Sequence, residues 1–165
     1  MTPLDARDPL VGRWLVYMNL IRERTLEDVE GLNVEALDHT TAEQVNSIGT
    51  LLYHIAVIEL DWLYAEILEQ DFPEDIMVHF PYDVREQTGR LMQVRGWELG
   101  RYLEILELIR NDFIQKLSPF DEAEFLRPRD LPDYSVTPEW VCWHLLEHEA
   151  GHQGQIKTMK AALNR

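Results

Sequence analysis

The sequence contains a single cysteine, Cys142, among its 165 residues. One cysteine cannot form a disulfide within the chain, so a disulfide-stabilised secreted domain is excluded and a reducing cytoplasm is the expected compartment. The first five residues, MTPLD, also lack the basic and apolar regions of a secretion signal. We expect Cys142 to have a packing role rather than to act as a ligand.

Basic residues are scarce. The chain has 15 lysines and arginines against 30 acidic residues, which gives a formal net charge of −15. Phosphate backbones and anionic membranes would repel such a surface. Uninterrupted apolar runs of the ~18 residues that a membrane span needs are missing as well. We therefore expect neither nucleic acid nor a membrane as a partner, and a well-solvated surface is the ordinary reason for this charge.

Apolar residues are plentiful, at 45% of the chain, which is enough for a globular fold with a buried core. At this length we expect one domain that spans residues 1–165. The apolar residues recur with helical spacing almost throughout, without the alternation typical of strands and without an internal repeat. The pattern therefore predicts an all-α protein, a four-helix bundle.

Four segments carry the helical spacing: residues 9–29, about 51–69, 83–117, and 138 to near the end. Asp83 and Glu86 have the spacing of a capping box, which predicts the start of the third helix there. Thr137 and Pro138 are typical of a helix start, with a hydroxyl cap followed by proline in the first turn. Residues 118–136 are expected to form a loop longer than a bundle needs, either functional or a surface excursion.

Histidines gather in two of these helices: four of the six are His54 in the second and His144, His148 and His152 in the fourth. Residues four apart lie on one helix face, so the pair His144/His148 or the pair His148/His152 forms half of a divalent-metal site. The two outer residues are separated by about 12 Å along the axis, too far to share one ion. His54, beside the apolar face of its helix, is the best candidate for a third ligand. The competing interpretation is that these are ordinary buried histidines.

The segment HEAGH, residues 148–152, also matches the HExxH motif of zinc proteases, in which Glu149 would be the general base. Its context argues against that interpretation. No glutamate follows His152, and the longer form of the motif would need glycine and histidine where Gln155 and Thr158 stand.

Two longer segments resemble the DinB/YfiT-like superfamily: SIGTLLYHIAVIE at residues 47–59, and HLLEHEAGHQGQI at residues 144–156. The resemblance implies a four-helix bundle with up-down-down-up topology. It also implies a metal site with one histidine on the second helix and a histidine pair, four apart, on the last. The implied ligands are His54, His148 and His152. His144, one turn before the pair, matches a position that lines or supports the pocket.

The same resemblance implies a function, because the superfamily includes transferases that use low-molecular-weight thiols. We expect a metal-dependent enzyme that transfers such a thiol to an electrophilic small molecule, with zinc or nickel as the divalent ion and a homodimer as the assembly. Glu149 is a further candidate pocket residue, although it is rotated about 100° from His148. Two alternatives remain: a metal-dependent hydrolase on the same ligands, and a non-catalytic metal-binding dimeric scaffold.

Overall fold

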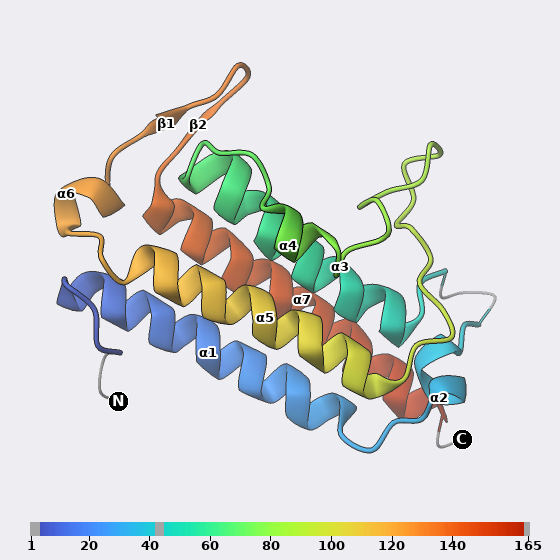
Figure 1. Ribbon diagram of the computed structural model, residues 1–165. Helices are drawn as coiled ribbons and strands as arrows, with labels where there is room; N and C mark the ends of the chain where they lie inside the picture. The colour runs from blue at the N-terminus through green and yellow to red at the C-terminus, as the bar shows by residue number, and fades with distance from the viewer. Residues whose placement is uncertain (1–3, 42–44, 164–165) are drawn as a thin grey trace.

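The computed structural model describes residues 4–41 and 45–163, and its regular structure is almost entirely helical (Figure 1). Residues 1–3, which belong to the segment where we expected no secretion signal, lie outside the described residues. In chain order the elements are α1 (Pro9–Val29), α2 (Val34–Asp38), α3 (Ile48–Asp61), the π-helix η1 (Trp62–Ile67), α4 (Glu74–Met77), α5 (Leu99–Leu117), α6 (Glu122–Phe125), β1 (Arg129–Asp130), β2 (Ser135–Val136) and α7 (Pro138–Leu163). The prediction of an all-α fold is confirmed.

Helices α1 and α7 begin where the sequence predicts. The Asp8 carboxylate accepts a hydrogen bond from the backbone N–H of Leu10 at 2.8 Å, and Pro9 is the first helical residue. At α7, the hydroxyl of Thr137 accepts from the backbone N–H of Trp140 at 3.1 Å. In both helices the cap satisfies an N–H that has no partner within the helix.

The long helices are arranged as two pairs. α1 and α7 run in the same direction, since Trp14 near the start of α1 donates to Glu139 near the start of α7 at 3.2 Å. Late in α7, Gln153 donates to Asp28 at the end of α1 at 2.6 Å. In Figure 1, α3 and α5 begin at the end of the molecule where α1 and α7 finish. This arrangement sets the middle of α3 against the middle of α7, where the predicted site lies.

The third long helix starts later than predicted. Residues 83–98 are irregular, and α5 begins only at Leu99. The predicted capping box of Asp83 and Glu86 is wrong, because the Glu86 carboxylate accepts from the hydroxyl of the threonine two residues on at 3.2 Å. Gly89 and Gly96 have φ of 81° and 76°, values that an α-helix does not allow. These two left-handed residues interrupt the helix that the spacing alone had predicted.

The second long helix is built from two kinds of turn. α3 continues directly into the wider turn of η1, so that the predicted helix of about 51–69 is observed as Ile48–Ile67. Among the described helices, this stretch is long and apolar enough to cross a membrane by length and composition. However, 78% of its most apolar window is buried inside the bundle. It is therefore the core helix of the fold.

Residues 118–136 are more ordered than a simple loop. They contain α6 and the antiparallel pair β1–β2, two short strands that the sequence did not predict. Arg129 is 1% exposed, and its Nε donates to the carbonyl of Ile67 at the end of η1 at 2.9 Å. Tyr134 donates to Glu66 at 2.7 Å. The segment is thus fastened to the end of η1.

Candidate metal centre

Helices α3 and α7 bring three histidines together. His54 is buried in α3, whereas His148 and His152 lie one turn apart on α7 and are half-buried. The Nε2 atom of His148 lies 3.1 Å from Nε2 of His54 and 3.1 Å from Nε2 of His152. One potential ligand atom from each residue lies within 4.8 Å of the other two. The structure thus joins the three residues that the sequence singled out, and we call them the histidine cluster.

The donor set of the histidine cluster fits a divalent metal ion. Two nitrogens bound to one tetrahedral ion at about 2.0–2.1 Å lie about 3.3 Å apart, close to the 3.1 Å found for each of the two facing pairs. A neutral imidazole carries one N–H and one lone pair. His148 Nε2 faces two such nitrogens at once, so hydrogen bonding alone cannot satisfy all three. A shared cation would use all three lone pairs.

Burial holds the imidazoles in the form that a metal requires. Desolvation, then the charges of His152 and Arg85, lowers the pKa of His54 to about 4. Desolvation and the neighbouring histidine charges lower the pKa of His148 to about 3. Desolvation also lowers the pKa of His152. Because a coordinating nitrogen must be unprotonated, the cluster can bind a metal at pH 7 without first losing protons.

Gln155 orients the ring of His152. Its Oε1 lies 3.1 Å from His152 Nδ1, where the amide oxygen accepts from the ring N–H. That tautomer leaves the lone pair on Nε2, directed at His148. By contrast, His54 Nδ1 is buried without a hydrogen-bond partner among the described residues, so packing fixes that ring. Sequence reasoning missed Gln155, although its position three residues after His152 placed it on the same helix face.

His144 lies beside the cluster but outside it. Its ring stacks on Trp140, with centroids 5.1 Å apart and planes 5° apart, and it also contacts Trp62 at 4.6 Å. The rings of His144 and His148 are 6.1 Å apart. Of the two pairs that the spacing allowed, the structure therefore sets His148/His152 against His54. Cys142 is fully buried, and burial raises the pKa of its thiol, which agrees with a packing role.

Glu149 does not line the site, so its prediction as a pocket residue is corrected. It is 2% exposed, and its two oxygens accept from Arg22 Nε at 2.7 Å and from Arg110 Nη2 at 3.1 Å. Glu59 accepts from the same two guanidinium groups, at 2.5 Å from Arg22 and 2.6 Å from Arg110. Because both carboxylate oxygens of Glu149 accept hydrogen bonds from arginines, neither is free to act as a general base. The zinc-protease interpretation, which needs Glu149 as that base, is therefore excluded. We call these four residues the charge quartet.

The charge quartet takes one residue from each long helix, and sequence reasoning missed three of the four. Arg22, Glu59 and Arg110 each directly follow an isoleucine, so each stands next to an apolar position of its helix. A charge at the edge of an apolar stripe was the available signal, but its partners lie on other helices. Burial alone would raise the pKa of Glu59, but the charges of Arg110 and Arg22 outweigh it and lower that pKa. The two arginines therefore hold the Glu59 carboxylate in its charged form in the interior.

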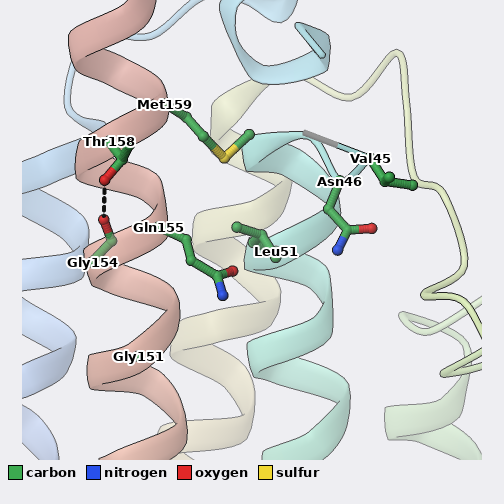
Figure 2. A pocket seen from close by; sticks show the side chains of 8 residues that line it. All are labelled: Val45, Asn46, Leu51, Gly151, Gly154, Gln155, Thr158 and Met159. Carbon is green, nitrogen blue, oxygen red and sulfur yellow. Dashed lines mark hydrogen bonds between the residues drawn. The ribbon is translucent and has the colours of Figure 1, made fainter. Parts of the chain in front are cut away.

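A pocket of about 570 Å³ opens next to His152, between the second half of α7 and the start of α3 (Figure 2). Its size is within the range of small-molecule sites. Gln155, which bonds to His152, is part of its wall, so the pocket adjoins the histidine cluster. The lining residues are Val45, Asn46, Leu51, Gly151, Gly154, Gln155, Thr158 and Met159.

Comparisons with known proteins agree with this fold. The sequence profile of the DinB superfamily matches residues 17–156. Uncharacterized protein YkkA of Bacillus subtilis (strain 168) is 24% identical over 116 residues, which cover 70% of this chain and 65% of YkkA. A solved structure of a conserved protein from Enterococcus faecalis matches with a TM-score of 0.69 at 15% identity, over 90% of this chain and 93% of that one. At such an identity this structural likeness shows the fold alone.

Proposed function

The chain belongs to the DinB superfamily, and on that premise we propose that it is a metal-dependent enzyme. The histidine cluster holds a divalent ion, zinc or nickel. One observation carries the proposal: three imidazoles with lowered pKa values direct their Nε2 atoms at one point. Three histidine ligands leave coordination positions open, as in catalytic rather than structural metal sites.

The reaction that we propose is the transfer of a low-molecular-weight thiol to an electrophilic small molecule. A divalent ion bound there would supply a Lewis acid that stabilises a thiolate near neutral pH. The thiol loses its proton to solvent, its sulfur forms a bond to an electrophilic carbon, and the leaving group departs with its electron pair. In this reaction His54, His148 and His152 are the ligands, and Gln155 holds the His152 ring in the required tautomer.

The pocket next to the cluster favours an enzyme over a metal-stabilised scaffold, since a scaffold needs no cavity at its metal. A hydrolase would use the same ligands with water in place of the thiol, so the experiment below includes both reactions. We further propose that the protein works in the cytoplasm as a homodimer, the commonest assembly of soluble oligomers. Its net charge of −15 would repel nucleic acid and anionic membranes, which supports small molecules as its partners.

The test of this proposal is His148→Ala, with the exposed His39→Ala as the matched control. We expect the purified wild type and the control to hold about one ion per chain by elemental analysis. We expect His148→Ala to bind zinc at least about a hundredfold more weakly, because it loses the ligand that faces both others. The rate at which His148→Ala consumes thiol, measured with a panel of small thiols and a generic electrophile, should fall together with its zinc affinity. Its helix signal in far-ultraviolet circular dichroism should stay unchanged.

Two outcomes would count against the proposal. Full activity in His148→Ala, or in protein stripped of metal by a chelator, would show that the ion is not catalytic. Hydrolysis of ester substrates without thiol consumption would replace the transferase by the hydrolase.

A further inference from the structure

The pocket beside His152 has an unusual wall for this chain. Charged residues make up 27% of the sequence, yet none of the eight residues that line the pocket is ionisable. A charged ligand placed there would find no counter-ion among the lining residues. The wall therefore suits an uncharged molecule, whose apolar part would contact Leu51 and Met159.

The two amide side chains of the pocket present hydrogen-bond donors. Oε1 of Gln155 is already bonded to His152, and Oδ1 of Asn46 accepts from Gln93 at 3.2 Å. Each amide thus has its oxygen engaged, and its NH₂ group has no partner among the described residues. Figure 2 shows both amides on the pocket wall, one on each side of Leu51. Two NH₂ groups without a partner are complementary to the oxygen of a carbonyl or amide.

Two glycines keep this pocket wide. Gly151 and Gly154 lie inside α7, where each costs about 0.5–1 kcal/mol relative to alanine. A Cβ atom at either position would meet no atom within 4 Å. Packing within the chain therefore does not require a glycine at either place, and a larger side chain there would extend into the open space of the pocket.

From these three observations we infer that the pocket binds the non-reacting part of an uncharged, carbonyl-bearing substrate, and that Gly151 and Gly154 set its size limit. The inference rests on the proposed function for its assignment of the ligand as the electrophile. The contact between Gln155 and His152 links the two, because a carbonyl bonded to the Gln155 NH₂ group lies next to a ligand of the proposed metal.

The test measures binding without turnover. Isothermal titration of the metal-free protein uses N-hexylpropanamide and its analogue with a carboxylate at the far end of the hexyl chain, in high salt to screen the surface charge. We expect the neutral amide to bind, and the carboxylate to bind about tenfold more weakly or worse. Gly154→Leu should weaken binding of the neutral amide by about tenfold or more, because its side chain fills the pocket.

Gly100→Leu is the matched control, because Gly100 is a helical, exposed glycine of α5 with no atom within 4 Å of an added Cβ. It should leave binding unchanged, and thermal melts should show both leucine variants folded. Equal binding of the two ligands, no binding by the wild type, or unchanged binding in Gly154→Leu would overturn the inference. So would a change of molar mass in light scattering for Gly154→Leu alone, since the pocket would then be an interface between two copies.

Metal content and thiol consumption, measured on the same preparations, separate this inference from the proposed function. Amide binding by a protein that takes up no metal would support the pocket and defeat the proposed function. Metal uptake and thiol transfer without amide binding would support the proposed function and overturn the inference about the pocket.

Discussion

Two polar clusters meet on α7 at consecutive residues, and they differ in how completely they are bonded. His148 belongs to the histidine cluster, and the next residue, Glu149, belongs to the charge quartet. In the quartet every carboxylate oxygen accepts from a guanidinium group, and the two positive and two negative charges cancel. In the histidine cluster three Nε2 atoms face one another, and buried His54 Nδ1 has no partner among the described residues.

This difference separates a polar group whose bonds are complete within the chain from one that a ligand could complete. Every carboxylate oxygen of the quartet already has a guanidinium partner within the chain, so none is left to bind a ligand. The quartet joins all four long helices, and through Glu59 and Glu149 it sets α3 against α7. The histidine cluster is incomplete within the chain, and a cation from outside would complete it. The quartet therefore fixes the helix positions at which the histidines converge.

The largest effect is expected from breaking the quartet. Glu149→Ala leaves two buried guanidinium groups with one carboxylate between them, which should lower the free energy of unfolding by about 3–5 kcal/mol. Urea denaturation measures this change. Glu147→Ala, at an exposed position of the same helix, should change stability by less than about 0.5 kcal/mol. Equal effects of the two substitutions would mean that the quartet does not hold the bundle together.

A smaller effect is expected in the histidine cluster, where the measured quantity is the affinity for zinc. Gln155→Ala removes the acceptor that orients His152, and we expect zinc affinity to fall about tenfold with little loss of stability. Competition with a chromophoric chelator measures it. Gln155→Glu retains an acceptor oxygen and should restore most of the affinity. If alanine and glutamate behave alike at this position, Gln155 does not act through the His152 ring.

The smallest effect is expected from pH in the metal-free protein. His54 and His148 have folded-state pKa values of about 4 and about 3, below the ordinary 6.5. The unfolded chain therefore binds more protons between pH 6.5 and 4, so the free energy of unfolding falls as the pH is lowered through this window. We expect the variant His54→Gln to lose about 0.5–1 kcal/mol less than the wild type between pH 7 and pH 6. Urea titrations at the two pH values measure the difference, and equal losses would contradict it.

Local patterns in the sequence were sufficient to predict much of the fold and to single out the histidines of the site. The cap at Thr137 and the proline after it place the start of α7 correctly, because a helix start depends on neighbouring residues. The spacing of His148 and His152 places them on one face for the same reason. The left-handed turns at Gly89 and Gly96 were missed, since apolar spacing does not report backbone φ.

The charge quartet was missed for a different reason. Its members are up to 127 residues apart, and no local pattern pairs Arg22 with Glu149. Glu149 was instead assigned to the pocket from its neighbours, and only the packing of four helices shows that it points inward. Which of two histidine pairs meets His54 is likewise decided by helix packing, and the resemblance to a family, rather than the spacing, indicated it.

The order of these residues along the chain also has a consequence for synthesis on the ribosome. Until α7 is made, Arg22 and Arg110 have only Glu59 to balance them, and an excess positive charge resists burial. Glu149 restores neutrality, and the same turn of helix delivers His148, 94 residues after His54. Before α7 is made, the chain therefore offers only His54 of the histidine cluster. The metal ion that we propose would then be bound only after α7 has packed against the other three long helices.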